Sequence, residues 1–130
     1  MIVAVHVATG GLAGALVGSR RAAVPLGLVL HLVGDVIPHR DFRARGFEVG
    51  SGAAGVVALA LRRGLGDPAT IGAAASSIPD LEHVLPLPRP GGRKLFPSHR
   101  WAPLHRSGGA SAGLQLAVAL AALGVLLARR

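Results

Sequence analysis

Cysteine is absent from the 130-residue chain, and aromatic residues make up only 3% of it. Without cysteine the protein has neither disulfides nor thiolate ligands, so a zinc finger is excluded. Because aromatic side chains are so few, a large soluble core would have to consist of Ala, Val, Leu and Gly, which bury little area per residue. The length indicates a single domain, residues 1–130.

Charged residues are also scarce, at 15% against 51% hydrophobic residues, and the mean hydropathy is +0.53. A chain of this composition is too apolar for a disordered segment. The composition favours a membrane protein over a soluble one.

Acidic residues number 6 against 14 Lys and Arg, which gives a formal net charge of +8. In a polar chain this excess would suggest a nucleic-acid partner. Here the basic residues form short clusters between apolar runs, among them Arg20-Arg21, Arg62-Arg63 and Arg129-Arg130. Such flanking charges anchor helices at membrane surfaces, so the sequence predicts a lipid bilayer, and not a nucleic acid, as partner.

Five apolar segments follow one another, at residues 2–17, 22–37, 49–61, 69–85 and 111–128. None shows the alternation of a half-buried strand, and small residues recur at helical spacing, as at Gly10, Gly14 and Gly18. The sequence therefore predicts an all-α fold, a compact integral-membrane bundle of about five helices. The uncharged segment 111–128 is expected to be a transmembrane helix, while the other four are shorter than the roughly 20 residues that cross a bilayer.

Two pairs of landmarks indicate an internal repeat. A shift of 42 places lays residues 6–10 on residues 48–52 and brings Arg20-Arg21 onto Arg62-Arg63. Ile37-Pro38 then aligns with Ile78-Pro79 when one residue is removed. The sequence predicts two copies of a helical hairpin, at about residues 6–42 and 48–83. The alternative is that helices rich in Ala and Gly resemble one another without duplication.

The ionisable residues are unevenly placed along the chain. If the helices run alternately up and down, the histidines and nearly all the acids fall at or near one end of the bundle. The opposite end then holds the three Arg-Arg pairs and Asp67. The residues at the first end are His6, His31, Asp35, His39, Asp41, Glu48, Asp80, Glu82, His83, His99 and His105.

Two of these clusters have the spacing of metal ligands. His31 and Asp35 are four residues apart and share one helical face, and both are costly in an apolar helix unless they are paired or bind a metal. Asp80 and His83 are three residues apart and can chelate one ion, while Glu82 remains free as a base. The alternatives are a His-Asp pair that ties helices together and an acidic turn after a helix.

These motifs resemble those of the membrane-bound metal-dependent hydrolases, small helical bacterial proteins with an N-terminal His, a PDxDH turn, an HRGxTHS segment and an HxxxD helix. His6 corresponds to the N-terminal His, and Asp80 to His83 correspond to the PDxDH turn, with Glu82 in place of the second Asp. His99 to Ser107, which include Trp101, correspond to the HRGxTHS segment, and His31 to Asp35 correspond to the HxxxD helix. The HxxxD helix is also similar to that of zinc-dependent phospholipase C. In this chain the HxxxD helix precedes the PDxEH turn, and the Thr-His pair is missing. The resemblance implies a metal-dependent hydrolase in the bacterial inner membrane.

The leading hypothesis is therefore a membrane-bound hydrolase in which metal-activated water attacks an ester or a phosphoester. Neutral imidazoles and carboxylates fit Zn²⁺ best, and Mn²⁺ or Fe²⁺ next. Glu82 or Asp41 is the predicted general base. The predicted ligands are His6, His31, Asp35, His39, Asp80, His83, His99 and His105. The basic residues expected to bind an anionic phosphoester or phospholipid headgroup are Arg40, Arg93, Lys94, Arg100 and Arg106.

Two other hypotheses stay open. A metal-binding or transport-associated membrane protein without catalysis would use the same ligands but fill the coordination sphere. A structural bundle would only pair its histidines and acids across helices. The sequence leaves the substrate, the number of ions, the side of the membrane and the oligomeric state undecided.

Overall fold

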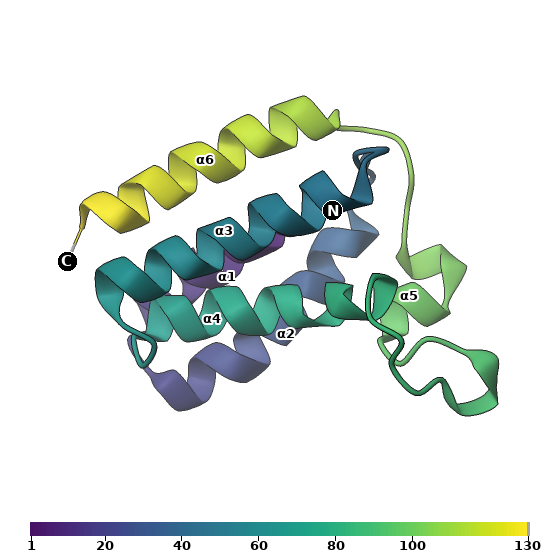
Figure 1. Ribbon diagram of the computed structural model, residues 1–130, viewed down its shortest axis with the longest axis horizontal. Helices are drawn as coiled ribbons and strands as arrows, with labels where there is room; N and C mark the ends of the chain where they lie inside the picture. The colour runs from purple at the N-terminus through teal and green to yellow at the C-terminus, as the bar shows by residue number, and fades with distance from the viewer. Residues whose placement is uncertain (130) are drawn as a thin grey trace.

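The computed structural model describes residues 1–129, and its secondary structure is helical (Figure 1). The helices are α1 (Val3–Val17), α2 (Arg20–Val36), α3 (Arg45–Arg63), α4 (Pro68–Ser77), α5 (Pro97–Arg100) and α6 (Ala112–Ala128), with the 3₁₀ helices η1 (Ile78–His83), η2 (Pro90–Gly92) and η3 (Ala102–Leu104). Isolated bridges from His39 to Ser107 and Ala110 are the β-type pairings in this part of the chain. The prediction of an all-helical fold agrees with this structure.

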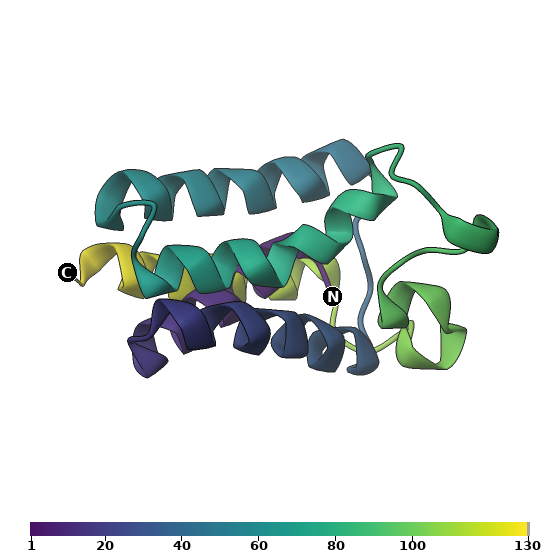
Figure 2. The ribbon, with the colours of Figure 1, turned by 90° about the horizontal axis from the view of Figure 1, so that it is seen from below.

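Helix α1 is the centre of the bundle and contacts α2, α3, α4 and α6 (Figures 1 and 2). Its first half is buried almost completely, including Val5, Val7 and the ring of His6. The core is otherwise made of small and aliphatic side chains such as Ala73 and Leu59. The position of α1 therefore carries His6 into the interior.

Glycines let the backbones of α1 and α4 approach one another closely. A Cβ built on Gly72 would overlap the carbonyl oxygen of Gly10, and a Cβ on Gly14 would overlap the carbonyl of Pro68. Such a contact is possible only where the side chain is a hydrogen atom. The small-residue pattern seen in the sequence thus has its role inside the bundle.

Helix α4 begins and ends with clear local signals. Asp67 caps it by accepting a hydrogen bond from the backbone N–H of Ala69, and Pro68 occupies its first turn. The helix ends at Ser77 and continues as the 3₁₀ helix η1, whereas the sequence predicted a helix to about residue 85. Pro79 lacks the N–H that an α-helix requires, so the chain tightens there and places Asp80, Glu82 and His83 on a short turn.

The long helices alternate in direction, so that the starts of α1, α3 and α6 and the ends of α2 and α4 lie at the same end (Figure 1). The segment that joins η1 to α6, with α5 and η3, covers this end. Two successive hairpins, α1–α2 and α3–α4, make up most of the bundle. The duplication of residues 6–42 and 48–83 stays a prediction.

The prediction of an integral-membrane bundle is wrong. Among residues 1–129, no helix has both the length and the hydropathy that a bilayer crossing requires. Helix α6, the expected transmembrane helix 111–128, has 17 residues and α1 has 15, against the roughly 20 of a span. Helix α3 reaches 19 residues but carries Glu48 and three arginines. The same finding overturns the predicted location in the bacterial inner membrane.

A substitution at the α1–α4 contact tests this packing. Gly72→Ala is expected to lower the free energy of unfolding by about 1 to 3 kcal/mol, because two backbones would have to separate. Gly50→Ala is the control, since Gly50 is helical and a Cβ there meets nothing within 4 Å. The control is expected to gain about 0.5 to 1 kcal/mol from helix propensity. Equal effects of the two substitutions in urea denaturation would contradict the close approach.

Candidate metal centre

The predicted site residues come from separate parts of the chain and lie together at one end of the bundle. Helix α1 supplies His6, α2 supplies His31 and Asp35, the turn after α2 supplies His39 and Asp41, η1 supplies Asp80, Glu82 and His83, α5 supplies His99, and the turn after η3 supplies His105. Every one of these side chains contacts at least one other member of the set. The bundle therefore brings together all the histidines of the chain.

Within this cluster, four groups of three side chains have candidate ligand atoms no more than 4.8 Å from one another. The groups are His6, His31 and Asp80; His31, Asp35 and His99; Asp35, His39 and His105; and Asp80, His83 and His99. These His and Asp groups can hold a metal ion.

Asp35 is the carboxylate on which most of these contacts converge. Its Oδ1 accepts a hydrogen bond from the Met1 α-amino group at 2.9 Å and lies 3.1 Å from His6 Nε2. Its Oδ2 accepts a hydrogen bond from Ser98 Oγ at 2.7 Å. Three more ring nitrogens lie near Oδ2: His31 Nε2 at 3.1 Å, His99 Nε2 at 3.3 Å and His105 Nδ1 at 3.6 Å. An oxygen with two lone pairs cannot accept all of these as hydrogen bonds.

The carboxylate of Asp35 is charged although it is buried. Burial alone would raise its pKa, but its contacts with the rings of His105, His31, His6 and His99 hold the pKa of Asp35 below its usual range. The interior of the site therefore contains a negative charge, which the Met1 α-amino group at 2.9 Å and the ring of His105 at 3.6 Å balance in part.

Three histidines have their Nδ1 atoms fixed by oxygen acceptors. Nδ1 of His31 donates to the Ser76 carbonyl oxygen at 2.8 Å, and Nδ1 of His39 donates to the Ile37 carbonyl oxygen at 2.7 Å. Nδ1 of His99 donates to Glu82 Oε1 at 2.6 Å. A carbonyl or carboxylate oxygen can only accept, so each neutral ring carries its lone pair on Nε2. Metal-binding histidines show this pattern, in which the second nitrogen donates to an oxygen.

The lone pairs of His31 Nε2 and His99 Nε2 and an oxygen of Asp35 face one another. The two nitrogens are 3.2 Å apart, and Asp35 Oδ2 is 3.1 Å from the first and 3.3 Å from the second. Three acceptors at these separations repel one another unless a proton or a cation lies between them. Two ligands of a tetrahedral zinc ion with bonds of 2.0 to 2.1 Å are about 3.3 to 3.4 Å apart, so the donor set fits a small divalent ion.

Three residues in contact with this triangle carry unpaired buried polar atoms. His6 Nδ1, Ser76 Oγ and Asp80 Oδ2 have no hydrogen-bond partner in the part of the chain that the structure describes. Asp80 Oδ1 lies 3.6 Å from His99 Nε2, and burial raises the pKa of Asp80 to about 6. Unsatisfied buried groups are rare and costly, so their presence next to the triangle supports a bound cation there.

Glu82, one of the two predicted bases, is buried and its carboxylate accepts three hydrogen bonds. Oε2 accepts from the backbone N–H of Leu95 at 2.7 Å, and Oε1 accepts from Phe96 N–H at 3.3 Å and from His99 Nδ1. Burial opposes ionisation, but the bonds from Leu95, His99 and Phe96 lower the pKa of Glu82. The carboxylate is thus ionised and bonded to three donors between Leu95 and His99.

Asp41, the second predicted base, lies at the rim of the cluster and is 42% exposed. It is 3.3 Å from His39 Nε2 and 3.6 Å from His105 Nε2, and these contacts hold the pKa of Asp41 below its usual range. In turn, the carboxylates of Asp35 and Asp41 raise the pKa of His105 to about 9. Asp41 and His105 form an ion pair at neutral pH.

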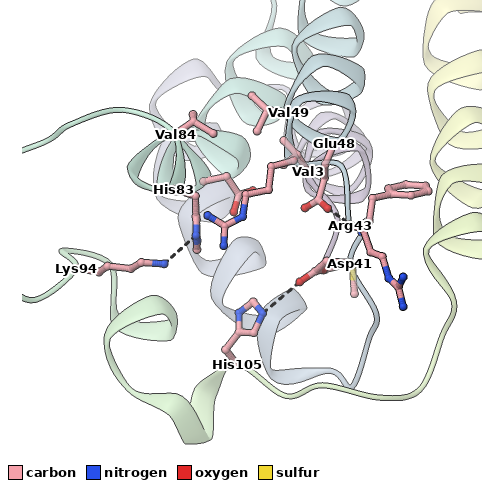
Figure 3. Close-up of a pocket in the computed structure, with 13 residues that line it drawn as sticks. Val3, Asp41, Arg43, Glu48, Val49, His83, Val84, Lys94 and His105 are labelled. Atoms are coloured by element: carbon pink, nitrogen blue, oxygen red, sulfur yellow. Dashed lines mark hydrogen bonds and ion pairs between the residues drawn. The ribbon is translucent and has the colours of Figure 1, made fainter.

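A cavity of about 450 Å³ opens beside the cluster (Figure 3). Asp41, Asp80, His83 and His105 belong to both the cluster and the cavity wall. Lys94 Nζ donates to His83 Nδ1 at 2.8 Å across the opening, and burial is the main cause that lowers the pKa of His83 to about 4. A small molecule in this cavity would lie against the candidate ligands.

Two residues at the site were not anticipated from the sequence. Ser98 is buried and donates to Asp35, but a serine next to a histidine carries no distinctive spacing. Gln115 accepts from Ile2 N–H and donates to the carbonyl oxygens of Arg40 and Ala110, which ties the start of α1 to the turn after α2. The one polar side chain in the apolar segment 112–128 was the signal that could have identified it.

The buried carboxylate of Asp80 makes a pH-dependent prediction for the metal-free protein. Its raised pKa means that the folded state binds the proton more tightly than the unfolded state. The stability from that proton is present below about pH 4 and is lost as the pH rises through 6. Asp80→Asn is expected to raise the free energy of unfolding at pH 8 by on the order of 2 kcal/mol, and by less at pH 5. Urea denaturation of metal-free protein at both pH values measures this, and a less stable variant at pH 8 would contradict it.

Comparisons of the chain with protein-family models, with curated proteins and with solved structures find no match. The resemblance to the metal-dependent hydrolases therefore stays a prediction based on the motifs quoted above. The arrangement of the side chains supplies the basis for a functional proposal.

Proposed function

We propose that the protein is a metal-dependent hydrolase of an anionic ester, with its reaction at the cavity beside the histidine cluster. Three side chains, His31, Asp35 and His99, would hold the ion, and Asp80 is the nearest fourth ligand. Neutral imidazoles and carboxylates of this kind fit Zn²⁺ best, with Mn²⁺ or Fe²⁺ as the next candidates. When bound, such an ion lowers the pKa of a coordinated water to about 7 and polarises the ester.

The proposal is carried by the position of His31, Asp35 and His99 beside a cavity, since Asp80, which lies 3.6 Å from His99 and 3.9 Å from His31, forms part of the cavity wall. A purely structural cluster would be expected to satisfy its own donors and acceptors, whereas His6 Nδ1 and Asp80 Oδ2 are left unpaired here. A closed storage site would be expected to lack a neighbouring space. The cavity wall instead includes Asp80 and His83 from one candidate ligand group and His105 from another.

Asp41 is the base that we assign, because it reaches the cavity. Of the two predicted bases, Glu82 is occupied by three N–H donors, while Asp41 lines the cavity and is half-exposed. Its carboxylate is ionised at neutral pH and can accept the proton of an attacking water. His105, which is its imidazolium partner, would keep it oriented.

The cavity wall also contains cations that suit an anionic substrate. These are Arg43, Arg45 and Lys94, of which only Lys94 belongs to the basic residues expected from the sequence. In Figure 3 the ammonium of Lys94 points toward His83, whereas the guanidinium of Arg43 turns away from the middle of the cavity. Lys94 and Arg45 are therefore the candidates to pair with a phosphate or carboxylate of the substrate.

Metal analysis and hydrolysis assays test the proposal together. Purified protein loaded with Zn²⁺ is expected to retain the ion after dialysis, and His31→Ala is expected to lose it. The loaded protein is expected to hydrolyse bis(p-nitrophenyl) phosphate or the lipids of phosphatidylglycerol vesicles. Hydrolysis of the first would indicate a soluble phosphoester as substrate, and hydrolysis of the second would indicate a lipid headgroup.

Asp41→Asn is expected to lower the hydrolysis rate by about 10²- to 10⁴-fold with the metal content unchanged, because a general base contributes a factor of that size. Asp67→Asn is the control, since Asp67 lies at the opposite end of the bundle. Retained metal without hydrolysis of either substrate would favour a metal-binding protein without catalysis. Absence of bound metal would refute the proposal altogether.

A further inference from the structure

We propose that Glu82 is a positioning residue that orients His99 toward the metal site, and not a proton acceptor in the reaction. This inference rests on the metal site of the proposed function. It assigns Glu82 a role different from the one that the spacing of Asp80, Glu82 and His83 suggested.

The first observation is that three N–H donors from the segment between Leu95 and His99 engage the Glu82 carboxylate. Its two oxygens accept from His99 Nδ1 at 2.6 Å, from Leu95 N–H at 2.7 Å and from Phe96 N–H at 3.3 Å. The residue is 3% exposed and is not part of the wall of the 450 Å³ cavity. It lines a separate cavity of about 230 Å³ whose other walls are apolar side chains such as Leu95 and Phe96. A general base must be within hydrogen-bond reach of the proton that it removes, and the Glu82 carboxylate is bonded to His99, Leu95 and Phe96 instead.

The second observation concerns what the bond does to His99. A neutral ring that donates from Nδ1 has its lone pair on Nε2, and that atom lies 3.2 Å from His31 Nε2 and 3.3 Å from Asp35 Oδ2. Rotation of the ring is further limited by His83 and Phe96, whose ring centroids lie 4.2 and 5.8 Å away. A carboxylate partner of this kind fixes the tautomer of a metal-binding imidazole and raises its basicity.

The third observation is that His99 depends on Glu82 more than the other ligands depend on their partners. His31 and Asp35 belong to the 17-residue helix α2, whose own hydrogen bonds hold its backbone. His99 belongs to α5, which has only four residues and lies between the 3₁₀ helices η2 and η3. Glu82 binds both the backbone before α5, at Leu95 and Phe96, and the His99 ring, so one carboxylate sets both the place and the direction of this ligand.

Metal affinity distinguishes positioning from proton transfer. Glu82→Gln is expected to weaken binding of Zn²⁺ by about 10- to 100-fold and to change the visible spectrum of the Co²⁺-substituted protein. Glu48→Gln is the matched control, because Glu48 also accepts a backbone N–H, from Phe42, whereas only Glu82 of the two accepts from a histidine ring. The control is expected to bind both ions as the wild type does.

An unchanged Zn²⁺ affinity and Co²⁺ spectrum in Glu82→Gln, with hydrolysis lost, would overturn the positioning role and leave the proposed function standing. Failure of the wild type to bind metal would overturn both. A measurement on the unmodified protein covers the case in which the variant does not fold. Long-range ¹H–¹⁵N NMR spectra at pH 8 are expected to show His99 protonated on Nδ1, and protonation on Nε2 alone would contradict the proposal.

Discussion

The buried carboxylate of Asp35 is the constraint on which this site depends. Its Oδ2 has more nitrogen and oxygen neighbours than it has lone pairs, and in neutral rings the lone pairs of His31 Nε2 and His99 Nε2 face it and one another. The hydrogen bonds of His31 Nδ1 and His99 Nδ1 maintain this arrangement, because each fixes a proton on the ring nitrogen that points away from Asp35. A small cation placed among these acceptors would remove the repulsion.

The packing of the bundle serves this arrangement. Gly10 and Gly72 allow α1 and α4 to touch, which brings the chain after α4 close to the ring of His6 on α1. A Cβ on Gly34 would likewise meet the ring of His6, so the close fit of α2 on α1 brings Asp35 within reach of that ring. The small residues of the core bury little apolar area, but they let the helices pack densely around the polar cluster.

Helical periodicity and the alternation of helix direction were enough to predict an all-α fold and to gather the histidines at one end. The same apolar pattern led to the wrong prediction of an integral-membrane bundle. Helices rich in glycine and alanine pack as closely in a short bundle as they do in lipid, so the pattern does not distinguish the two. The segment between residues 84 and 111 has no periodicity, so the placement of Ser98 and the engagement of Glu82 by Leu95 could not be anticipated. The spacing therefore pointed to the His and Asp residues that lie together, whereas the hydrogen bonds among them depend on distant parts of the chain and could not be predicted.

The central claim is that imidazoles of distant segments and the carboxylate of Asp35 bind one ion together. X-ray absorption spectroscopy at the zinc edge of the loaded protein measures this directly. The structure predicts a first shell of nitrogen and oxygen atoms at about 2.0 to 2.1 Å, with the outer-shell scattering of at least two imidazoles. A zinc ion surrounded only by water oxygens, without imidazole scattering, would contradict the claim.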